Sequence, residues 1–339
     1  MRPFAYERVP DPAAAQRAVP VGSSSAAAPV PTMVLAGGTT LLDLMKLDVL
    51  RPERLLDIRP LESRLGAIRL DGQGLRLGAL ARMAQVADDV EVRREFPVLA
   101  ESLALAASAQ LRNMATLGGN VLQRTRCSYY RDVSYAACNK RNPGSGCAAL
   151  DGYNRLHAVL GTSEHCIASY PGDFAQALMA LDAVVEIEGP QGGRSMPFAE
   201  LHRAPGDRPD IETTLRPGEL ITAFQVPAGP WAKRSRYVKV RDRQSYAFAA
   251  ASAAVALDLD GDRVRGVRIA LGGVATRPWR ATDAEAALAG QRLDEASAMR
   301  AAEVAFRDAR THGENDDKPE LGRRTLVRAL LEAQRMEIA

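Results

Sequence analysis

Apolar residues recur with helix-like and strand-like periods along most of the chain, and the two patterns alternate over short stretches in its first half. Strands are predicted at residues 3–8, 33–36, 55–58 and 75–80. Helices are predicted at residues 12–19, 41–46, 82–88 and 95–109, with a Ser/Ala/Pro-rich loop at 21–31. The helix over 95–109 is the clearest, because Leu99, Leu103 and Ala106 fall on one face.

The second half continues this mixture and changes character after residue 226. Asp173 is expected to cap a helix that runs to Leu181, and strands are predicted at 156–160, 183–188 and 220–226. A polar, proline-rich stretch (204–217) and a linker (227–233) surround the last of these strands. Beyond the linker we expect a separate domain with a strand at 236–240, a hairpin of 245–259 with 263–272, and helices at 282–289, 294–310 and 320–336.

Composition narrows the class of protein. The 339 residues are 46% hydrophobic and 25% charged, which is enough to build a sizeable core, and no apolar run is long enough to span a bilayer. The net charge of +3 and the 5% aromatic content do not favour nucleic-acid binding. The N-terminus leads straight into folded-looking sequence without a signal peptide, so we expect either a cytoplasmic protein or a periplasmic one exported by a partner's twin-arginine signal.

One segment breaks the pattern. Residues 123–152 are rich in Arg, Asn, Lys, Tyr, Pro and Gly with little apolar periodicity, so they are not expected to fold around their own apolar side chains. The region around them holds every cysteine of the chain: Cys127, Cys138, Cys147 and Cys166.

Four interpretations of these cysteines are open from their spacing. Two disulfides suit a small secreted domain better than a chain of this length. Structural zinc usually uses closely paired cysteines, whereas an iron–sulfur cluster tolerates varied spacing in a wrapping loop. Glycines near Cys147 and the surrounding Arg and Lys residues would offset a cluster's negative charge. Four unrelated buried cysteines would be a coincidence, since none occurs elsewhere. Neither zinc nor iron–sulfur is selected by spacing alone.

Two glycine turns are the other candidate chemistry. The predicted strand at 33–36 is followed by Gly37-Gly38-Thr39-Thr40 and a helix, an arrangement whose backbone N–H groups can face a phosphate. It matches neither a Rossmann motif nor a P-loop, and alone a simple tight turn is the commoner outcome. A second turn contains Thr116, Gly118, Gly119 and Asn120. The chain has four His residues and no Ser/His/Asp arrangement or carboxylate pair, so it offers few groups for acid–base catalysis on a substrate. We expect His165, next to Cys166, to be solvent-facing or structural rather than a ligand.

Ala36-Gly-Gly-Thr39 and Arg112-Asn-Met-Ala-Thr-Leu-Gly-Gly-Asn120 together resemble the FAD-binding medium subunit of the xanthine dehydrogenase family of molybdenum hydroxylases. The resemblance extends over essentially the whole chain, including Lys239-Val-Arg-Asp-Arg243 and Leu271-Gly-Gly-Val274. Most members pass directly from the second glycine motif to the aspartate matching Asp173. The cysteine-bearing insertion here is similar to that of the flavoprotein subunit of bacterial, periplasmic-type molybdenum aldehyde oxidoreductases, which carries an additional [4Fe–4S] cluster.

This resemblance implies an α+β fold with two domains. Residues 1–228 would form a two-lobed FAD-binding domain (PCMH/vanillyl-alcohol-oxidase-like) with a [4Fe–4S] insertion at about 121–168. Residues 229–339 would form a small C-terminal domain with a three-stranded sheet and helices. The cluster ligands implied are Cys127, Cys138, Cys147 and Cys166. The implied FAD contacts are Met33, Val34, Leu35, Ala36, Gly37, Gly38, Thr39, Thr40, Leu41, Thr116, Gly119, Asn120, Asp173, Ile221 and Lys239.

The function implied by the resemblance is electron transfer within a heterotrimer. A large partner with a molybdenum cofactor would oxidise an aldehyde to a carboxylic acid, and a small partner with [2Fe–2S] centres would pass electrons to FAD on this chain and then to an external acceptor. The competing hypothesis is a non-redox assembly module with the same fold, a structural zinc in the cysteine insertion and an empty FAD cleft. No catalytic residue is expected on this chain.

Overall fold

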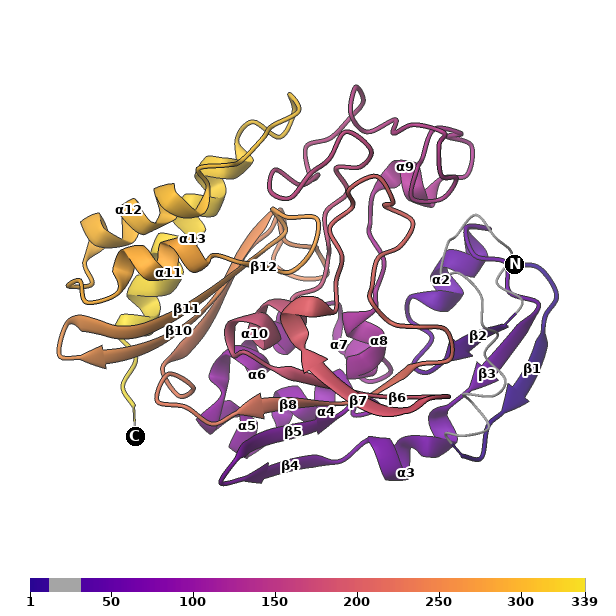
Figure 1. Ribbon diagram of the computed structural model, residues 1–339, viewed down its shortest axis with the longest axis horizontal. Helices are drawn as coiled ribbons and strands as arrows, with labels where there is room; N and C mark the ends of the chain where they lie inside the picture. Colours follow the sequence, from indigo (N-terminus) through magenta and orange to yellow (C-terminus); the bar gives the residue numbers. More distant parts are fainter. Residues whose placement is uncertain (12–31, 339) are drawn as a thin grey trace.

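The computed structural model describes residues 1–11 and 32–338, so the helix expected at 12–19 and the loop expected at 21–31 lie outside the described residues. Two sheet-based lobes, an irregular insertion and a C-terminal domain make up the described chain (Figure 1). The expected α+β architecture is confirmed by this arrangement.

The first lobe is a small parallel sheet of order β1-β3-β2, formed by β1 (Ala5–Arg8), β2 (Thr32–Leu35) and β3 (Arg54–Asp57). Helix α2 (Leu41–Lys46) follows β2 and buries Leu44 and Met45 against β3. Short helices η1 (Arg59–Leu61) and α3 (Glu62–Leu65) then lead to the second lobe. The strand–turn–helix unit predicted at 33–46 is therefore present.

The second lobe is a five-stranded antiparallel sheet of order β4-β5-β8-β6-β7. Its strands are β4 (Ile68–Asp71), β5 (Gly74–Gly78), β6 (Val184–Gly189), β7 (Gly192–Pro197) and β8 (Leu220–Pro227). The helices of this lobe are α4 (Met83–Asp88), α5 (Val90–Glu95), α6 (Pro97–Ala104), α7 (Ala109–Arg112), α8 (Leu117–Val121), α10 (Phe174–Ala180) and the short η2 (Phe198–Glu200). Strand and helix side chains share one large core, in which Leu77, Leu99, Phe174 and Phe224 are fully buried.

The helix predicted over 95–109 is shorter than expected. It ends at Ala104, because Ala107 adopts a left-handed backbone conformation with φ of 49° and interrupts the helical hydrogen bonding. Ser108 then caps α7 by accepting a hydrogen bond from the amide of Leu111. This break turns the chain toward the second glycine segment.

The cysteine insertion has little regular structure, as predicted. Helix α9 (Ser128–Arg131) is its one described helix, and Figure 1 shows the rest as irregular loops above the two lobes. Tyr129, Ala149 and Ile167 form a small buried cluster inside it. Its base is closed by the Tyr170 hydroxyl, which donates to the carbonyl of Val121 at 2.8 Å.

The strand predicted at 156–160 is absent. Instead, the amides of Val159 and Leu160 both donate to the carbonyl of Val274, and only an isolated bridge forms, between Leu160 and Ala275. The buried ammonium of Lys318 reinforces this contact by donating to the carbonyls of Leu156, His157 and Gly273. The exit of the insertion is thus fastened to the C-terminal domain rather than paired within a sheet.

The C-terminal domain packs an antiparallel sheet against helices on one face (Figure 1). The strands are β9 (Ser235–Val240), β10 (Ala251–Asp260), β11 (Arg263–Gly272) and the two-residue β12 (Trp279–Arg280), which adds a short edge to the three strands expected. The helices are α11 (Thr282–Leu288), α12 (Glu295–Ala305) and α13 (Lys318–Gln334). Strand β10 begins later than the predicted residue 245, since residues 241–249 form a loop in which Tyr246 has a φ of 53°.

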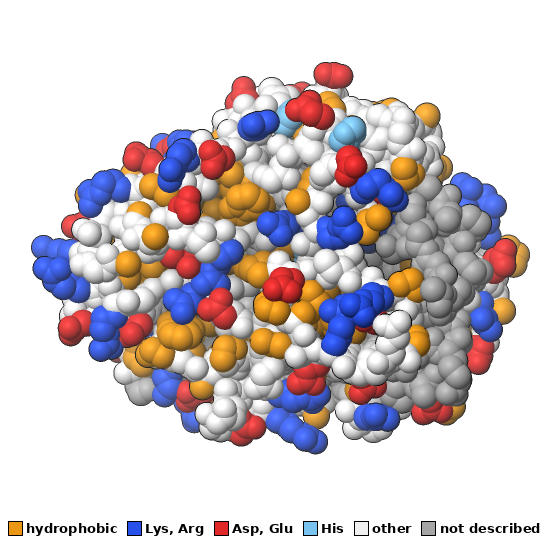
Figure 2. All heavy atoms as spheres, in the orientation of Figure 1, with side chains coloured by type: hydrophobic (Ala, Val, Ile, Leu, Met, Phe, Trp, Pro, Cys, Tyr) orange, Lys and Arg blue, Asp and Glu red, His pale blue; other side chains and the backbone are white. Residues whose placement is uncertain are grey.

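Among the residues described, no helix is long and apolar enough to cross a membrane. Figure 2 shows acidic and basic side chains interspersed over the visible face, without a continuous field of one sign. That mixture agrees with the small net charge.

Candidate functional site

The two glycine segments pack directly against each other. A side chain at Gly37 would place its Cβ 2.1 Å from the carbonyl oxygen of Met114, so this close approach of two backbones requires glycine. Gly38 has a φ of 74°, which the tight turn into α2 demands. Two turns far apart in the sequence thereby form one surface.

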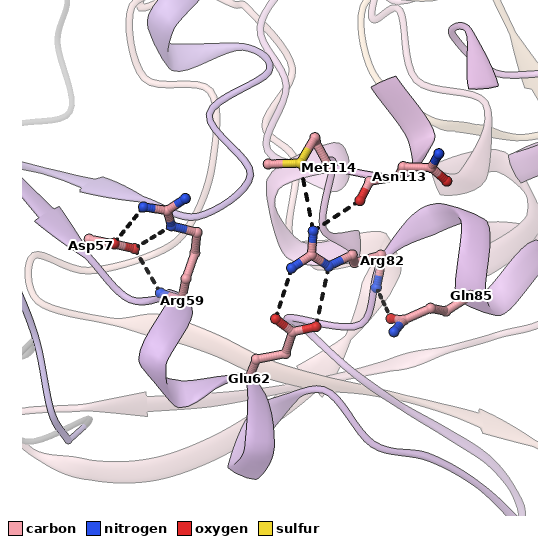
Figure 3. Close-up of polar contacts among 7 residues, drawn as sticks. All are labelled: Asp57, Arg59, Glu62, Arg82, Gln85, Asn113 and Met114. Carbon is pink, nitrogen blue, oxygen red and sulfur yellow. Dashed lines mark hydrogen bonds and ion pairs between the residues drawn. The ribbon is translucent and has the colours of Figure 1, made fainter. Parts of the chain in front are cut away.

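Arg82 holds the second glycine segment in place (Figure 3). Its guanidinium makes two hydrogen bonds to the carboxylate of Glu62, at 3.2 and 3.0 Å, and a third to the carbonyl of Asn113 at 3.0 Å. The Arg82 amide donates to Gln85, which fixes the start of α4. Arg82 thus connects α3, α4 and the backbone just before Met114.

Helix α8 grows from this second segment. Thr116 caps it by accepting a hydrogen bond from the amide of Gly119, and the amides of Leu117 and Gly118 donate to the carbonyls of Ala81 and Ala79. The side chain of Thr116 and the amides of Gly118 and Gly119 therefore already have partners within the protein.

A cavity of about 310 Å³ lies between the two glycine segments and the start of β8. Most of the residues expected to contact a cofactor line it: Met33, Val34, Ala36, Gly37, Gly38, Thr39, Thr40, Leu41, Thr116, Gly119 and Ile221. The walls are mainly apolar and backbone atoms. Such a surface suits an extended ligand with both an apolar part and a phosphate part.

A second cavity of about 440 Å³ adjoins the first, since Thr39 and Thr40 line both. Asn120 and Asp173 lie in its wall, as expected. The side-chain oxygen of Asn120 is buried and has no hydrogen-bond partner in the described protein. A buried acceptor left unpaired is costly, so this atom fits a ligand that brings an N–H or O–H donor.

Two of the expected contact residues lie outside both cavities. Leu35 is buried in the core of the first lobe beside Leu44. Lys239 is turned toward Asp173, with its Nζ 2.7 Å from Oδ2. Both residues could therefore act on a ligand only through the residues that they support.

Asp173 does not cap α10 through its side chain, contrary to the sequence-based expectation. Its carboxylate accepts hydrogen bonds from the Tyr237 hydroxyl at 2.6 Å and from the Lys239 ammonium at 2.7 Å. Burial raises the pKa of the Asp173 carboxyl, while the charge of Lys239 and the hydrogen bonds from Lys239 and Tyr237 oppose that shift. The charge-assisted hydrogen bond from Lys239 is stronger than one from a backbone amide, so the Asp173 side chain turns toward Lys239 and Tyr237 and away from the start of α10.

Several cavity residues were missed by the sequence analysis. Arg124 lines the smaller cavity, and Arg126, Tyr246 and Phe248 line the larger one. The Arg126 guanidinium lies over the ring of Phe248, 4.9 Å from its centroid. Tyr246 and Phe248 are two of the chain's few aromatic residues. Their position in a polar loop is the sequence feature that could have indicated a binding role.

All four cysteines are unpaired and line one very small cavity, of about 10 Å³, together with Tyr129 and Tyr130. The disulfide interpretation is thus contradicted. Cys138 and Cys147 face each other across an isolated antiparallel bridge. No three of the described His, Cys, Asp or Glu side chains are arranged to hold a single metal ion. His165 is exposed, as expected.

Burial raises the pKa of the Cys127 thiol to about 12 and that of Cys166 to about 11, and neighbouring cysteines add to both shifts. Burial of this kind keeps the thiols of Cys127 and Cys166 protonated at neutral pH unless a cationic centre compensates the charge of their thiolates. Four unpaired thiols around one cavity match the number of thiolates that a [4Fe–4S] cluster takes as ligands.

Comparisons with known proteins agree along the whole chain. Residues 12–229 match the family described as the FAD binding domain in molybdopterin dehydrogenase, and residues 236–335 match the CO dehydrogenase flavoprotein C-terminal domain. The chain is 46% identical to the aldehyde oxidoreductase FAD-binding subunit PaoB of Escherichia coli (strain K12), over 98% of this chain and 99% of that one.

More distant relatives give the same picture. The carbon monoxide dehydrogenase medium chain of Afipia carboxidovorans is 27% identical over 90% of this chain and 88% of its own. The structure of reconstituted CO dehydrogenase from Oligotropha carboxidovorans superposes with a TM-score of 0.75 at 25% identity, covering 98% of this chain and 99% of that one.

Proposed function

The chain belongs to the family of FAD-binding medium subunits of molybdenum hydroxylases, and we propose that it serves an aldehyde oxidoreductase within that family. As a member it is the electron-transfer flavoprotein subunit of an oxidoreductase, which leaves the non-redox assembly module without support. The observation that carries the choice of aldehyde is the 46% identity to an aldehyde oxidoreductase subunit over nearly the full length of both chains.

FAD is the cofactor of the domain, and the two connected cavities support its placement. Backbone groups of Gly37, Gly38 and Thr39 would face the pyrophosphate, and the Asn120 side chain would accept a hydrogen bond from the cofactor. Ile221 would pack on the cofactor, and Asp173 would accept from a hydroxyl of its ribityl or ribose part, with Lys239 holding the Asp173 carboxylate in position. Bound there, FAD supplies the ability to take up electrons singly and to release them singly or in pairs.

We further propose that Cys127, Cys138, Cys147 and Cys166 ligate one [4Fe–4S] cluster. Their common cavity and their unpaired thiols support the proposal. The His157 ring lies with Nε2 3.1 Å from the sulfur of Cys127, which places a potential N–H donor next to a proposed ligand. The chain contains no fifth cysteine, so each of the four would be indispensable.

The chain would act as one subunit of a heterotrimer with a molybdenum-cofactor subunit and a [2Fe–2S] subunit. Its four cysteines suffice for one cluster and leave none for a [2Fe–2S] centre, so electrons would have to arrive from a partner. Two of its four His residues, His157 and His202, are buried, and burial lowers their pKa to about 4, so neither suits proton transfer to a substrate at neutral pH.

The test compares aldehyde oxidation by this chain alone with oxidation by the co-expressed complex, using a dye as electron acceptor. The complex is expected to oxidise aldehydes to carboxylic acids, and the isolated chain is expected to bind FAD without turnover. Turnover by the isolated chain, or a complex that leaves all aldehydes untouched, would contradict the proposal. A visible spectrum with iron and zinc analysis of the same samples separates the redox subunit from the assembly module.

A further inference from the structure

A buried ion network lies between the glycine-turn cavity and the cysteine cavity. Glu212 accepts a hydrogen bond from Arg124 at 2.5 Å through one carboxylate oxygen and from Lys140 at 2.8 Å through the other. The side chains of Arg124, Glu212 and Lys140 are 13%, 28% and 11% exposed. Each carboxylate oxygen is thus committed to a different cation.

The two cations belong to different sites. Arg124 lines the glycine-turn cavity. Lys140 lies within the cysteine insertion and lines the cysteine cavity, and its ammonium also donates to the carbonyl of Pro209 at 2.9 Å. Glu212 and Pro209 come from the loop between η2 and β8 of the FAD-binding domain. The carboxylate of Glu212 therefore bridges one side chain from each cavity.

Tyr130 makes a second connection between the same two sites. The Arg124 guanidinium lies over its ring, 5.0 Å from the centroid. Tyr130 lines the cysteine cavity. Its buried ring belongs to the same core cluster as Leu35 and Leu44, which lie on either side of the first glycine turn in the sequence. This packing keeps the Arg124 guanidinium beside the insertion and within reach of Glu212.

The charges favour an anionic ligand next to Arg124. Two cations share one carboxylate, so the network has a net positive charge. The Arg124 Nη2 is buried and has no hydrogen-bond partner in the described protein. An anionic part of a ligand in the cavity would satisfy that donor and balance the charge.

We propose that the Arg124–Glu212–Lys140 network couples the two cofactor sites, so that a cluster held by the insertion increases the affinity of the cleft for FAD. The inference rests on the proposed FAD and [4Fe–4S] sites. Coupling between two ligands is reciprocal, so FAD must also stabilise the insertion. Arg124 is a binding residue for FAD in this scheme, and Glu212 and Lys140 are positioning residues.

The experiment is a double-mutant cycle on the full chain, with the FAD dissociation constant measured by flavin fluorescence. Cys147→Ser supplies the cluster-free state, and Glu212→Gln removes the charge that joins the two cations while keeping the size of the side chain. Cys147→Ser should weaken FAD binding by about 5- to 150-fold in the natural background. In the Glu212→Gln background it should weaken binding by less than about twofold.

Lys140→Met and Glu186→Gln complete the design. Lys140→Met removes only the Lys140–Glu212 ion pair and keeps the Arg124–Glu212 pair, so it should abolish the coupling. Circular dichroism should show that the variant stays folded. Glu186→Gln makes the same substitution in a more exposed ion pair, with Arg76 on the five-stranded sheet, and should leave the coupling intact. In addition, FAD should slow tryptic cleavage within residues 124–155 of the natural chain and not of Lys140→Met.

The outcomes separate the coupling from the function that it rests on. An equal effect of Cys147→Ser in both backgrounds, or no effect in the natural one, overturns the coupling alone, provided that the natural chain holds FAD and the cluster iron. A natural chain without FAD or without cluster iron overturns the proposed function and the coupling together. Equal protection by FAD in the natural chain and in Lys140→Met also contradicts the coupling.

Discussion

Lys239 and Asp173 form a buried ion pair between the two domains, with the Lys239 Nζ 2.7 Å from Oδ2 of Asp173 and the two side chains 1% and 4% exposed. Asp173 starts α10 of the FAD-binding domain, and Lys239 lies near the end of β9 of the C-terminal domain. Tyr237, two residues earlier on β9, donates to the other oxygen of the same carboxylate. Both domains also line the larger cavity, since Asp173 and residues of the segment 242–248 face it.

Asp173→Asn is expected to destabilise the chain by about 3–5 kcal/mol, because it leaves the ammonium of Lys239 buried without its counter-charge. Urea unfolding measures the change. The double variant Asp173→Asn/Lys239→Met should recover part of the loss. Asp258→Asn, which breaks an exposed pair with Arg265, is the control and should cost about 1 kcal/mol or less. Equal losses for Asp173→Asn and Asp258→Asn would contradict the buried-pair argument.

Gly37→Ala is expected to lower the flavin content of the purified chain at least about tenfold. Its Cβ would lie 2.1 Å from the Met114 carbonyl oxygen, so the two glycine segments would have to separate, and overpacking of this kind costs about 1–3 kcal/mol. The readout is the ratio of flavin to protein absorbance. Gly72→Ala adds the same methyl group where nothing lies within 4 Å and should keep full flavin content. Retained flavin in Gly37→Ala would show that the cofactor does not need this contact.

Cys138→Ser is expected to remove most of the iron and acid-labile sulfide attributed to this chain, and the same holds for the other three cysteines. Four ligands are needed and four cysteines are present, so no substitute is available. Iron and sulfide are counted per complex after subtracting the small subunit's clusters. Ser134→Ala, an exposed change in the same segment, is the control. Stoichiometric zinc without additional iron in the natural chain would refute the cluster.

The pH dependence of stability should carry a contribution from His202. Burial lowers the pKa of His202 from 6.5 to about 4, although its ring N–H donates to the Val121 carbonyl. The unfolded chain therefore binds the proton more readily between pH 6.5 and 4, and the folded state loses stability as the pH falls through that window. The loss is on the order of 3 kcal/mol at about 1.4 kcal/mol per pH unit.

His202→Phe should remove this part of the acid sensitivity, because Phe fills the space between Tyr170 and Phe198 without taking up a proton. Urea unfolding at pH 7 and at pH 4.5 measures it. The variant should lose less stability than the natural chain between the two values. A loss of the same size in both would show that His202 does not titrate in this window.

The sequence predicted elements best where a periodic run ended at a turn residue. The strand, turn and helix of residues 33–46 were found because Gly37 and Gly38 separate two clear patterns. The helix expected to reach residue 109 stops at Ala104, since the left-handed conformation of Ala107 leaves no mark on apolar periodicity. The strand expected at 156–160 pairs its amides with Val274, a tertiary contact that no local pattern encodes.

For the candidate site, the two glycine motifs predicted most of the residues that line the cavities. The positions of the remaining site residues depend on tertiary packing. Leu35 lies in the same run as the cavity residues, yet its side chain packs into the core beside Leu44. The sequence predicts that the Asp173 side chain caps a helix. Its carboxylate instead accepts hydrogen bonds from Lys239 and Tyr237, which are 66 and 64 residues away. Arg124 and Glu212 are 88 residues apart, and no local sequence pattern around either residue predicts their ion pair.

The hydrogen bond from Tyr170 to the Val121 carbonyl makes the cysteine insertion a detour that leaves the scaffold and returns to the same point. Helices α8 and α10 are in contact next to this hydrogen bond, so a short turn would be enough to join them in a chain without the insertion. Such a junction lets a loop of this size be gained or lost without rearranging the lobes beneath it. For protein engineers, it marks a place at which other loops can be exchanged on the same scaffold.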